Sequence, residues 1–125
     1  MKYYLSLGSN INPQVNLDLA ISSLKKILID TQFSSVYQTK AEGFAGEDFL
    51  NLVFAGTSSL SFDDLNKALK QIEDHSGRDR SAPKFSDRTL DIDIVLQLND
   101  DEEILYESDE VAKYSFVSEP LAELI

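Results

Sequence analysis

The sequence has 125 residues, a length that predicts a single domain spanning residues 1–125. Its formal net charge of −11 argues against nucleic acid and anionic membranes as partners, because both bind basic surfaces. The chain has no cysteine, no apolar run of membrane-spanning length and no signal-peptide pattern, so we expect a cytoplasmic protein without disulfides.

Hydrophobic periodicity, helix caps and turn residues predict alternating strands and helices. In chain order, the expected elements are a strand at Tyr3–Leu7, a helix from Asn12 to Ile29, strands at Phe33–Tyr37 and Phe49–Thr57, a helix from Ser61 to about Gly77, a strand at Leu90–Leu98, a short edge strand at Ile104–Tyr106 and a final helical turn. This order, βαββαβ, predicts an α+β fold of the ferredoxin-like type. Its four-stranded antiparallel sheet would carry the helices on one face.

The last long strand, within "FSDRTLDIDIVL", carries two carboxylates on one face. Residues two apart on a strand share a face, so Asp91 and Asp93 lie about 7 Å apart. The opposite, apolar face is formed by Leu90, Ile92, Ile94 and Leu96. Carboxylates this close repel unless a cation lies between them, and Mg²⁺ with substrate phosphates suits such a pair. A solvated strand face is the alternative interpretation.

A basic patch precedes this strand. All the arginines of the chain, Arg78, Arg80 and Arg88, lie between Gly77 and Thr89. On an acidic protein, such a patch indicates a small anionic ligand, although a solvated loop would explain it equally well. Because this basic patch lies beside the two aspartates, it favours a site that binds phosphate and metal together.

Several short stretches together resemble the 6-hydroxymethyl-7,8-dihydropterin pyrophosphokinase family of folate biosynthesis. They are "LSLGSN", "SSVYQT", "DFLN", "IEDHSGRDR", "RTLDIDIVL" and "FVSEPLAEL", and they cover nearly the whole chain. The resemblance implies a ferredoxin-like fold and transfer of diphosphate from MgATP to the hydroxymethyl group of the pterin, releasing AMP. It also implies two Mg²⁺ ions with ATP, and ATP and a reduced pterin as partners. We expect a monomer, with a weak dimer as the alternative.

The resemblance also implies roles for individual residues by position. The metal ligands would be Asp91 and Asp93, and the catalytic arginines closing over phosphate would be Arg78 and Arg88. The other ATP-binding residues would be Glu73, Arg80 and Ile94. The pterin-binding residues would be Thr39, Lys40, Glu42, Phe49, Asn51 and Phe116. Core packing is the alternative role for the two phenylalanines, and Gly8, Ser9 and Asn10 are expected to shape a turn.

The sequence departs from the family pattern near its end. Where the family usually has a histidine and an arginine before the final phenylalanine, this chain has Ser108 and Tyr114, with Lys113 adjacent; the usual loop tryptophan is Phe85. These departures leave a second hypothesis open, a non-catalytic or weakly active paralogue that binds pterin or nucleotide. They predict weakened nucleotide binding, and a Ser108→His, Tyr114→Arg variant is expected to restore it.

Overall fold

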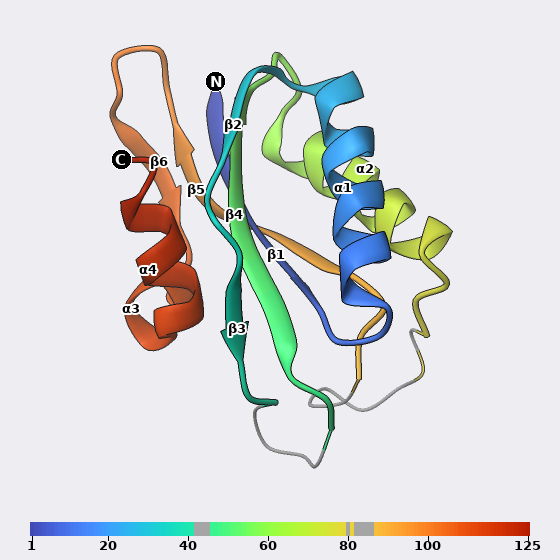
Figure 1. Cartoon of the computed structure of the whole chain (residues 1–125). Coiled ribbons are helices and arrows are strands. Elements are labelled where there is room, and N and C mark those ends of the chain that lie inside the picture. The colour runs from blue at the N-terminus through green and yellow to red at the C-terminus, as the bar shows by residue number, and fades with distance from the viewer. Residues whose placement is uncertain (42–45, 80, 82–86) are drawn as a thin grey trace.

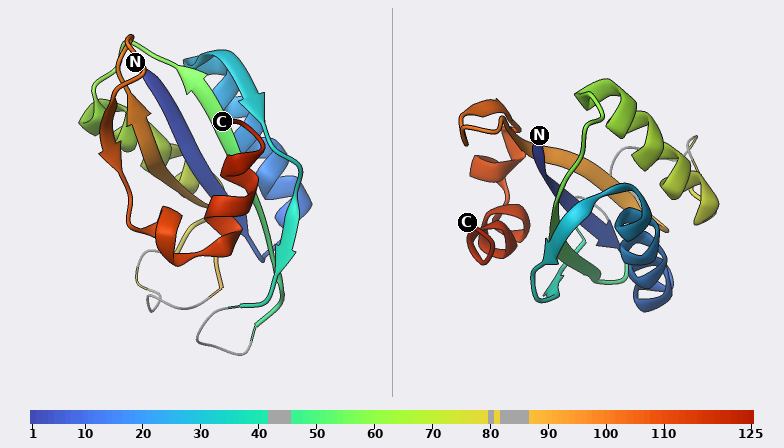
Figure 2. Two further views of the ribbon diagram at one scale, coloured as in Figure 1. Left: turned by 90° about the vertical axis from the view of Figure 1, so that its left-hand side faces the viewer. Right: turned by 90° about the horizontal axis from the view of Figure 1, so that it is seen from above.

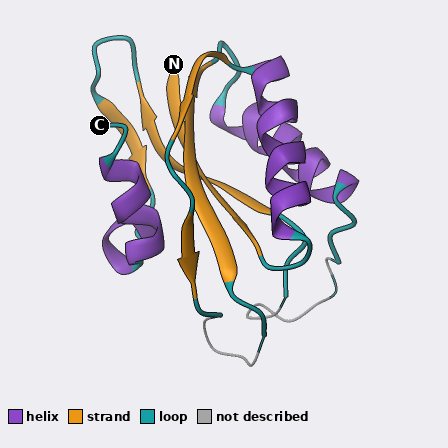
Figure 3. Cartoon of the chain, viewed as in Figure 1, coloured by secondary structure: helices purple, strands orange, loops and turns teal. Residues whose placement is uncertain are grey.

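The computed structural model describes residues 1–41, 46–79, 81 and 87–125. Its centre is a six-stranded sheet in which every pairing is antiparallel, with the order β2-β4-β1-β5-β6 and with β3 also paired to β4 (Figures 1 and 3). The elements are β1 (Lys2–Ser9), α1 (Pro13–Ile27), β2 (Ile29–Phe33), β3 (Tyr37–Thr39), β4 (Phe49–Thr57), α2 (Phe62–His75), β5 (Asp91–Leu98), β6 (Ile104–Glu107), α3 (Glu110–Lys113) and α4 (Ser115–Ala122).

The two predicted long helices are confirmed. Helix α1 begins with Pro13, although the side chain of Asn12 makes no capping hydrogen bond. Helix α2 has the predicted cap, in which the Ser61 hydroxyl accepts a hydrogen bond from the Asp64 amide at 3.2 Å. Both helices pack on one face of the sheet through apolar side chains at helical spacing. The buried ones include Leu17, Ala20, Leu24, Leu65, Leu69 and Ile72.

The prediction that helices cover only one face is wrong. Helices α3 and α4 lie on the side of the sheet opposite α1 and α2, as the view from above shows (Figure 2). The apolar side of α4, with Val117 and Leu121, packs on Tyr4, Val53 and Leu96 as a second buried cluster. The sheet therefore has apolar side chains on both faces, and the central strands β1, β4 and β5 supply them to both.

The strand count is also larger than the predicted four. The expected strand at Phe33–Tyr37 is not continuous, since β2 ends at Phe33 and β3 begins at Tyr37. At this break the Ser34 hydroxyl accepts the Val53 amide at 3.0 Å, although the Ser34 amide still donates to the Val53 carbonyl at 2.9 Å. The short edge strand near Ile104 is present as β6. No helix among the described residues is long and apolar enough to cross a membrane.

A β-bulge in β5 corrects the predicted apolar face of that strand. Tyr4 of β1 pairs with Leu96, but Leu5 pairs with Ile94, so Val95 is an extra residue. Ile94 therefore packs under α1 and α2, whereas Leu96 packs under α4. The bulge leaves Asp91 and Asp93 in the half of β5 that α4 does not pack against.

Helix α4 is also tied to the middle of the chain by a carboxylate near its end. Glu123 accepts hydrogen bonds from the Ser35 amide at 2.9 Å, from the Ser35 hydroxyl at 2.6 Å and from the Tyr37 hydroxyl. The bonds from Ser35 are the main reason that the pKa of Glu123 lies below its ordinary value. This connection fixes α4 against β3, the strand that pairs with the start of β4.

Candidate active site

The strand register brings the predicted pterin residues of β3 and β4 and the predicted metal ligands onto one face of the sheet. Gly8 of β1 pairs with Asn51 on one side and with Asp91 on the other. Tyr37 continues the row beyond Asn51. Directly paired residues point to the same face, and adjacent strands are about 4.8 Å apart, so the Cα atoms of Asn51 and Asp91 are roughly 10 Å apart.

Glycine at position 8 avoids a close contact in the middle of this row. A Cβ atom at Gly8 would lie 3.0 Å from the Asn51 Oδ1 atom and 3.7 Å from the Phe49 ring. The amide of Asn51 is buried, and its Nδ2 donates to the Thr39 Oγ1 atom at 2.7 Å. The predicted pterin residues Thr39, Phe49 and Asn51 therefore form one local group with a fixed amide orientation.

Among the described residues, β5 has no strand neighbour on its outer side beside the two aspartates, because β6 pairs only with Leu96–Leu98. The buried carboxylate of Glu73, from α2, takes the place of a strand there. It accepts the Ile92 amide at 2.7 Å. Helix α2 thus seals the edge of the sheet beside the two aspartates.

Two cations join Glu73 to the aspartates. Arg78 Nη1 lies 3.2 Å from Glu73 Oε1 and 3.1 Å from Asp91 Oδ1. Lys70 Nζ lies 3.2 Å from Glu73 Oε2 and 3.6 Å from Asp93 Oδ1. Within the described part of the chain, this cluster combines three carboxylates with two cations, so an added divalent cation would be electrostatically favourable.

The protonation of Asp93 reflects this environment. Burial first, and then the negative charge of Asp91, raise the pKa of Asp93 to about 7 against the opposing effect of Lys70. A carboxyl group that holds its proton near neutral pH is a ligand that a metal ion would have to deprotonate.

The donor set fits Mg²⁺ better than a metal that needs an all-protein site. Among residues 1–41, 46–79, 81 and 87–125, no group of three or more histidine, cysteine or acidic side chains could hold a metal ion. Two carboxylates alone suit Mg²⁺, which keeps several waters and takes phosphate oxygens as ligands.

The predicted ATP-binding residues differ in their burial and in their location in the fold. Arg78 is mostly buried, and its guanidinium is directed at the carboxylates and the Leu90 carbonyl. Glu73 is fully buried, and Ile94 lies in the core under α1 and α2. Arg88 is half-buried beside the β1–α1 turn. Arg80 lies outside the described residues.

The remaining predicted pterin residues lie at the margins. Lys40 is exposed just after β3, and Glu42 lies outside the described residues. Phe116, at the start of α4, is half-buried and stacks on Tyr114, with ring centroids 4.7 Å apart and 19° between the ring planes. Lys113 Nζ lies 5.4 Å from the centroid of the Tyr114 ring.

The two departures from the family pattern have structural roles. Ser108 is buried, and its hydroxyl accepts the Glu110 amide at 3.2 Å, where α3 begins. Tyr114 supports the ring of Phe116. A histidine at position 108 would have to be accommodated in a buried site, and an arginine at position 114 would remove the ring stack. We therefore no longer expect the Ser108→His, Tyr114→Arg variant to gain nucleotide affinity.

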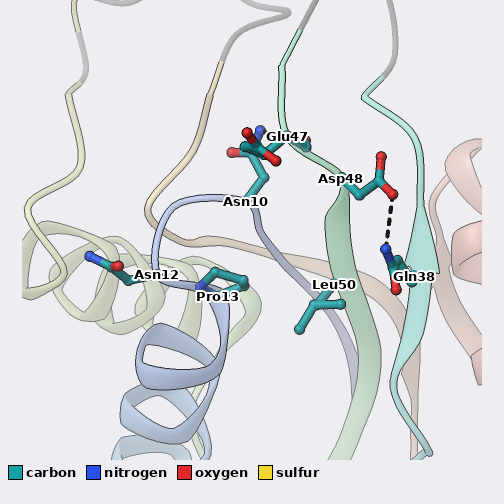
Figure 4. A pocket seen from close by; sticks show the side chains of 7 residues that line it. All are labelled: Asn10, Asn12, Pro13, Gln38, Glu47, Asp48 and Leu50. Carbon is teal, nitrogen blue, oxygen red and sulfur yellow. Dashed lines mark hydrogen bonds between the residues drawn. The ribbon is translucent and has the colours of Figure 1, made fainter.

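A pocket of about 410 Å³ opens at the same end of the sheet (Figure 4). Its lining residues come from the β1–α1 turn and from the facing ends of β3 and β4. They are Asn10, Asn12, Pro13, Gln38, Glu47, Asp48 and Leu50. Leu50 packs on the α1 side of the sheet, so the pocket opens on the α1 side and not on the face that carries Asn51 and Asp91.

Two residues that contact the site were not predicted. Lys70 has a sequence signal, since it lies three residues before Glu73 on the same helical face. Asn10 was expected only to shape a turn, yet its side chain bonds to segments far away in the sequence. No spacing rule predicts such contacts.

The raised pKa of Asp93 predicts a pH dependence. The folded protein holds a proton that the unfolded chain releases near pH 4, so stability contributed by this group declines as pH rises from about 4 to about 7. Mg²⁺ affinity should rise over the upper part of the same range, with release of a proton. Denaturation at pH 5.5 and pH 8 tests this prediction, with Asp93→Asn as the reference. An equal pH dependence in both proteins would contradict it.

Paired carboxylates beside arginine and lysine on an open antiparallel sheet are typical of proteins that bind nucleotide phosphates through Mg²⁺. A family model described as 7,8-dihydro-6-hydroxymethylpterin-pyrophosphokinase (HPPK) matches residues 4–125. The chain therefore belongs to the HPPK family, and the resemblance seen in the short motifs is confirmed.

Individual relatives agree with this family. A 2-amino-4-hydroxy-6-hydroxymethyldihydropteridine pyrophosphokinase of Aquifex aeolicus (strain VF5) is 38% identical over 95 residues, which cover 74% of this chain and 59% of the relative. A folate synthesis bifunctional protein of Chlamydia caviae is 40% identical over 100 residues, covering 74% of this chain and 22% of the relative. One of Arabidopsis thaliana is 28% identical over 127 residues, covering 97% of this chain and 26% of the relative. The chain thus spans less than two thirds of these relatives.

Proposed function

We propose that this chain transfers diphosphate from MgATP to the hydroxymethyl group of 6-hydroxymethyl-7,8-dihydropterin, giving AMP and the pterin diphosphate in folate biosynthesis. The observation that carries the proposal is the row Asn51–Gly8–Asp91 on one face of the sheet. Its span of roughly 10 Å is enough for a bicyclic ring held by its amide edge at one end and its hydroxymethyl group at the other. The absence of a side chain at Gly8 allows the Asn51 amide and the Phe49 ring to lie close to the strand between them.

The residues of this chain would divide the work in the following way. Asp91 and Asp93 would hold two Mg²⁺ ions with ATP, and the bound metal would withdraw charge from the transferring phosphate. Lys70 would orient the carboxylate of Asp93 and Arg78 that of Asp91. Both cations are themselves held by contacts with Glu73. Arg88 would contact phosphate from the segment that precedes β5. Positioning and charge stabilisation would supply most of the rate, and no general base is needed from the described residues.

The fold fits the same proposal. The strands β2-β4-β1-β5, together with α1 and α2, follow the order of a ferredoxin-like unit, to which β3, β6, α3 and α4 are added. A single domain, a monomeric state, a cytoplasmic location and the absence of nucleic acid as a partner remain predictions.

The direct test is AMP formation from MgATP, measured with and without the reduced pterin. We expect AMP to form only when both substrates and Mg²⁺ are present. Binding of both substrates without AMP formation would instead identify the non-catalytic paralogue. Absence of binding to either substrate would overturn the proposal.

The pterin half of the site is tested by ring removal. Phe49→Ala and Phe116→Ala should each weaken pterin binding by about 1–3 kcal/mol, because stacking and buried apolar area are lost. Calorimetric titration of the pterin, with a non-hydrolysable MgATP analogue present, measures the effect.

The matched control is Phe33→Ala. Phe33 lies on the outer strand β2, and its ring stacks on that of Phe54. The pterin affinity of this variant should equal that of the wild type. A variant at position 49 or 116 that loses thermal stability but keeps full pterin affinity would show that the phenylalanine belongs only to the core.

A further inference from the structure

The side chain of Asn10 connects three separate segments of the chain. It lies at the β1–α1 turn and is 5% exposed. Its Nδ2 donates to the Glu47 carbonyl at 3.0 Å and to the Asp87 Oδ1 atom at 2.7 Å. Its Oδ1 accepts the Arg88 amide at 2.8 Å. Both ends of one planar amide are therefore engaged, at sequence separations of 37, 77 and 78 residues.

The main chain around Asn10 strengthens the second of these connections. The Asn10 amide donates to the Arg88 carbonyl at 3.1 Å, and the Ser9 hydroxyl donates to the Thr89 carbonyl at 2.6 Å. Residues 87–89 are thus bonded to the β1–α1 turn immediately before the chain enters β5, the strand that carries the two aspartates. Glu47 lies two residues before Phe49 of β4.

The two segments that Asn10 joins lead directly to the two halves of the proposed site. Residues 46–48 enter β4 at Phe49, on the pterin side. Residues 87–90 carry Arg88 and enter β5 at Asp91, on the phosphate side. A displacement of either segment would change the distance between the pterin and the transferring phosphate, and displacements of about 1 Å are costly for such reactions.

We infer that Asn10 is a positioning residue of the proposed pyrophosphokinase reaction, setting the segment before β4 and the segment before β5 at a fixed distance. The inference rests on the proposed function. An amide suits this position because it offers two donors and an acceptor in one plane. An aspartate would keep the acceptor for Arg88, lose both donors and place a negative charge against Asp87.

The test compares Asn10→Asp with the control Asn16→Asp. Asn16 is also buried, but its Nδ2 donates at 2.6 Å to the Ile11 carbonyl within its own turn. Both variants lose buried donors, so both should lose stability. We expect only Asn10→Asp to lower kcat/KM for both substrates, by about tenfold or more. Asn16→Asp should stay within about twofold of wild type at a temperature where both variants are folded.

Two further variants protect the test against simple misfolding. In Asn10→Asp, Asp87→Asn, the new amide can donate to the new carboxylate, so the connection returns with its direction reversed and kcat/KM should recover most of its loss. Asp87 is exposed, so Asp87→Ala should fold and should lower kcat/KM by about threefold, since one of the three side-chain bonds is lost.

Hydrogen exchange gives a readout that does not depend on activity. Peptides covering residues 46–49 and 87–90 should exchange faster in Asn10→Asp than in Asn16→Asp. If wild type forms no AMP, the proposed function fails, while faster exchange in both segments would still support the connection. If wild type is active and Asn10→Asp matches Asn16→Asp in kinetics or in exchange, the positioning role is wrong.

Discussion

Replacing Asp93 with asparagine is expected to lower pterin-dependent AMP formation by about 100-fold or more, without destabilising the metal-free protein. Asp93 has a pKa raised to about 7 by burial and by Asp91, so its charge is unfavourable when no metal is bound. An asparagine keeps the shape, removes the repulsion and loses the metal ligand. Asp91→Asn should have a similar effect on activity, but should cost some stability because Asp91 pairs with Arg78 at 3.1 Å.

Thermal unfolding with and without Mg²⁺ and a non-hydrolysable ATP analogue measures both effects. Wild type should be stabilised by the two together, and neither aspartate variant should respond. Asp101→Asn, in the exposed β5–β6 turn, is the charge-matched control and should respond like wild type. If either variant at position 91 or 93 keeps the full Mg²⁺-dependent stabilisation, that residue is not a metal ligand.

Loss of the Glu73 carboxylate is expected to be the most destabilising change near the site. Glu73→Ala should cost about 3–5 kcal/mol in the free energy of unfolding, because it leaves the mostly buried Arg78 without one of its partners and the Ile92 amide without an acceptor. Denaturant unfolding measures this cost directly.

Glu73→Gln separates the two contributions. A glutamine can still accept the Ile92 amide, but it cannot balance the charges of Arg78 and Lys70, so its cost should be intermediate. Gln71→Ala, on the exposed side of α2, controls for helix position. If Glu73→Ala costs no more than this control, the carboxylate does not seal the sheet edge as described.

Helical spacing and capping residues were sufficient to predict α1 and α2, since both signals are local. Helix α4 was expected only as a helical turn, because it has eight residues and contains Pro120, which weakens its helical pattern. The second apolar face was therefore missed. The bulge at Val95 was missed as well, because strict alternation along β5 assumes a register that only pairing with β1 can establish.

In the site, too, features with a local sequence signal were predicted and features that depend on distant segments were not. The spacing of Asp91 and Asp93 was enough to predict that they share a face of their strand, and the resemblance to the family assigned Phe49 and Asn51 to the pterin. Only the strand register shows that these residues lie on the same face of the sheet. The contacts of the two aspartates could not be predicted, since Lys70 reaches Asp93 from α2 and Arg78 reaches Asp91 from the segment after α2. Arg78 was expected to reach outward to phosphate, but its guanidinium is directed at the carboxylates.

The bulge at Val95 has a consequence for how the chain tolerates changes in length. The half of β5 after the bulge is held between β1 and β6, whereas β1 is the only described strand that pairs with the half before it. Deleting Val95 would make Ile94 and Leu96 neighbours opposite Leu5 and Tyr4, so the alternation would become regular and Asp91 and Asp93 would keep their face. A regular strand would thus keep its charged surface, and what it would lose is the buried Val95 side chain in the apolar cluster under α4.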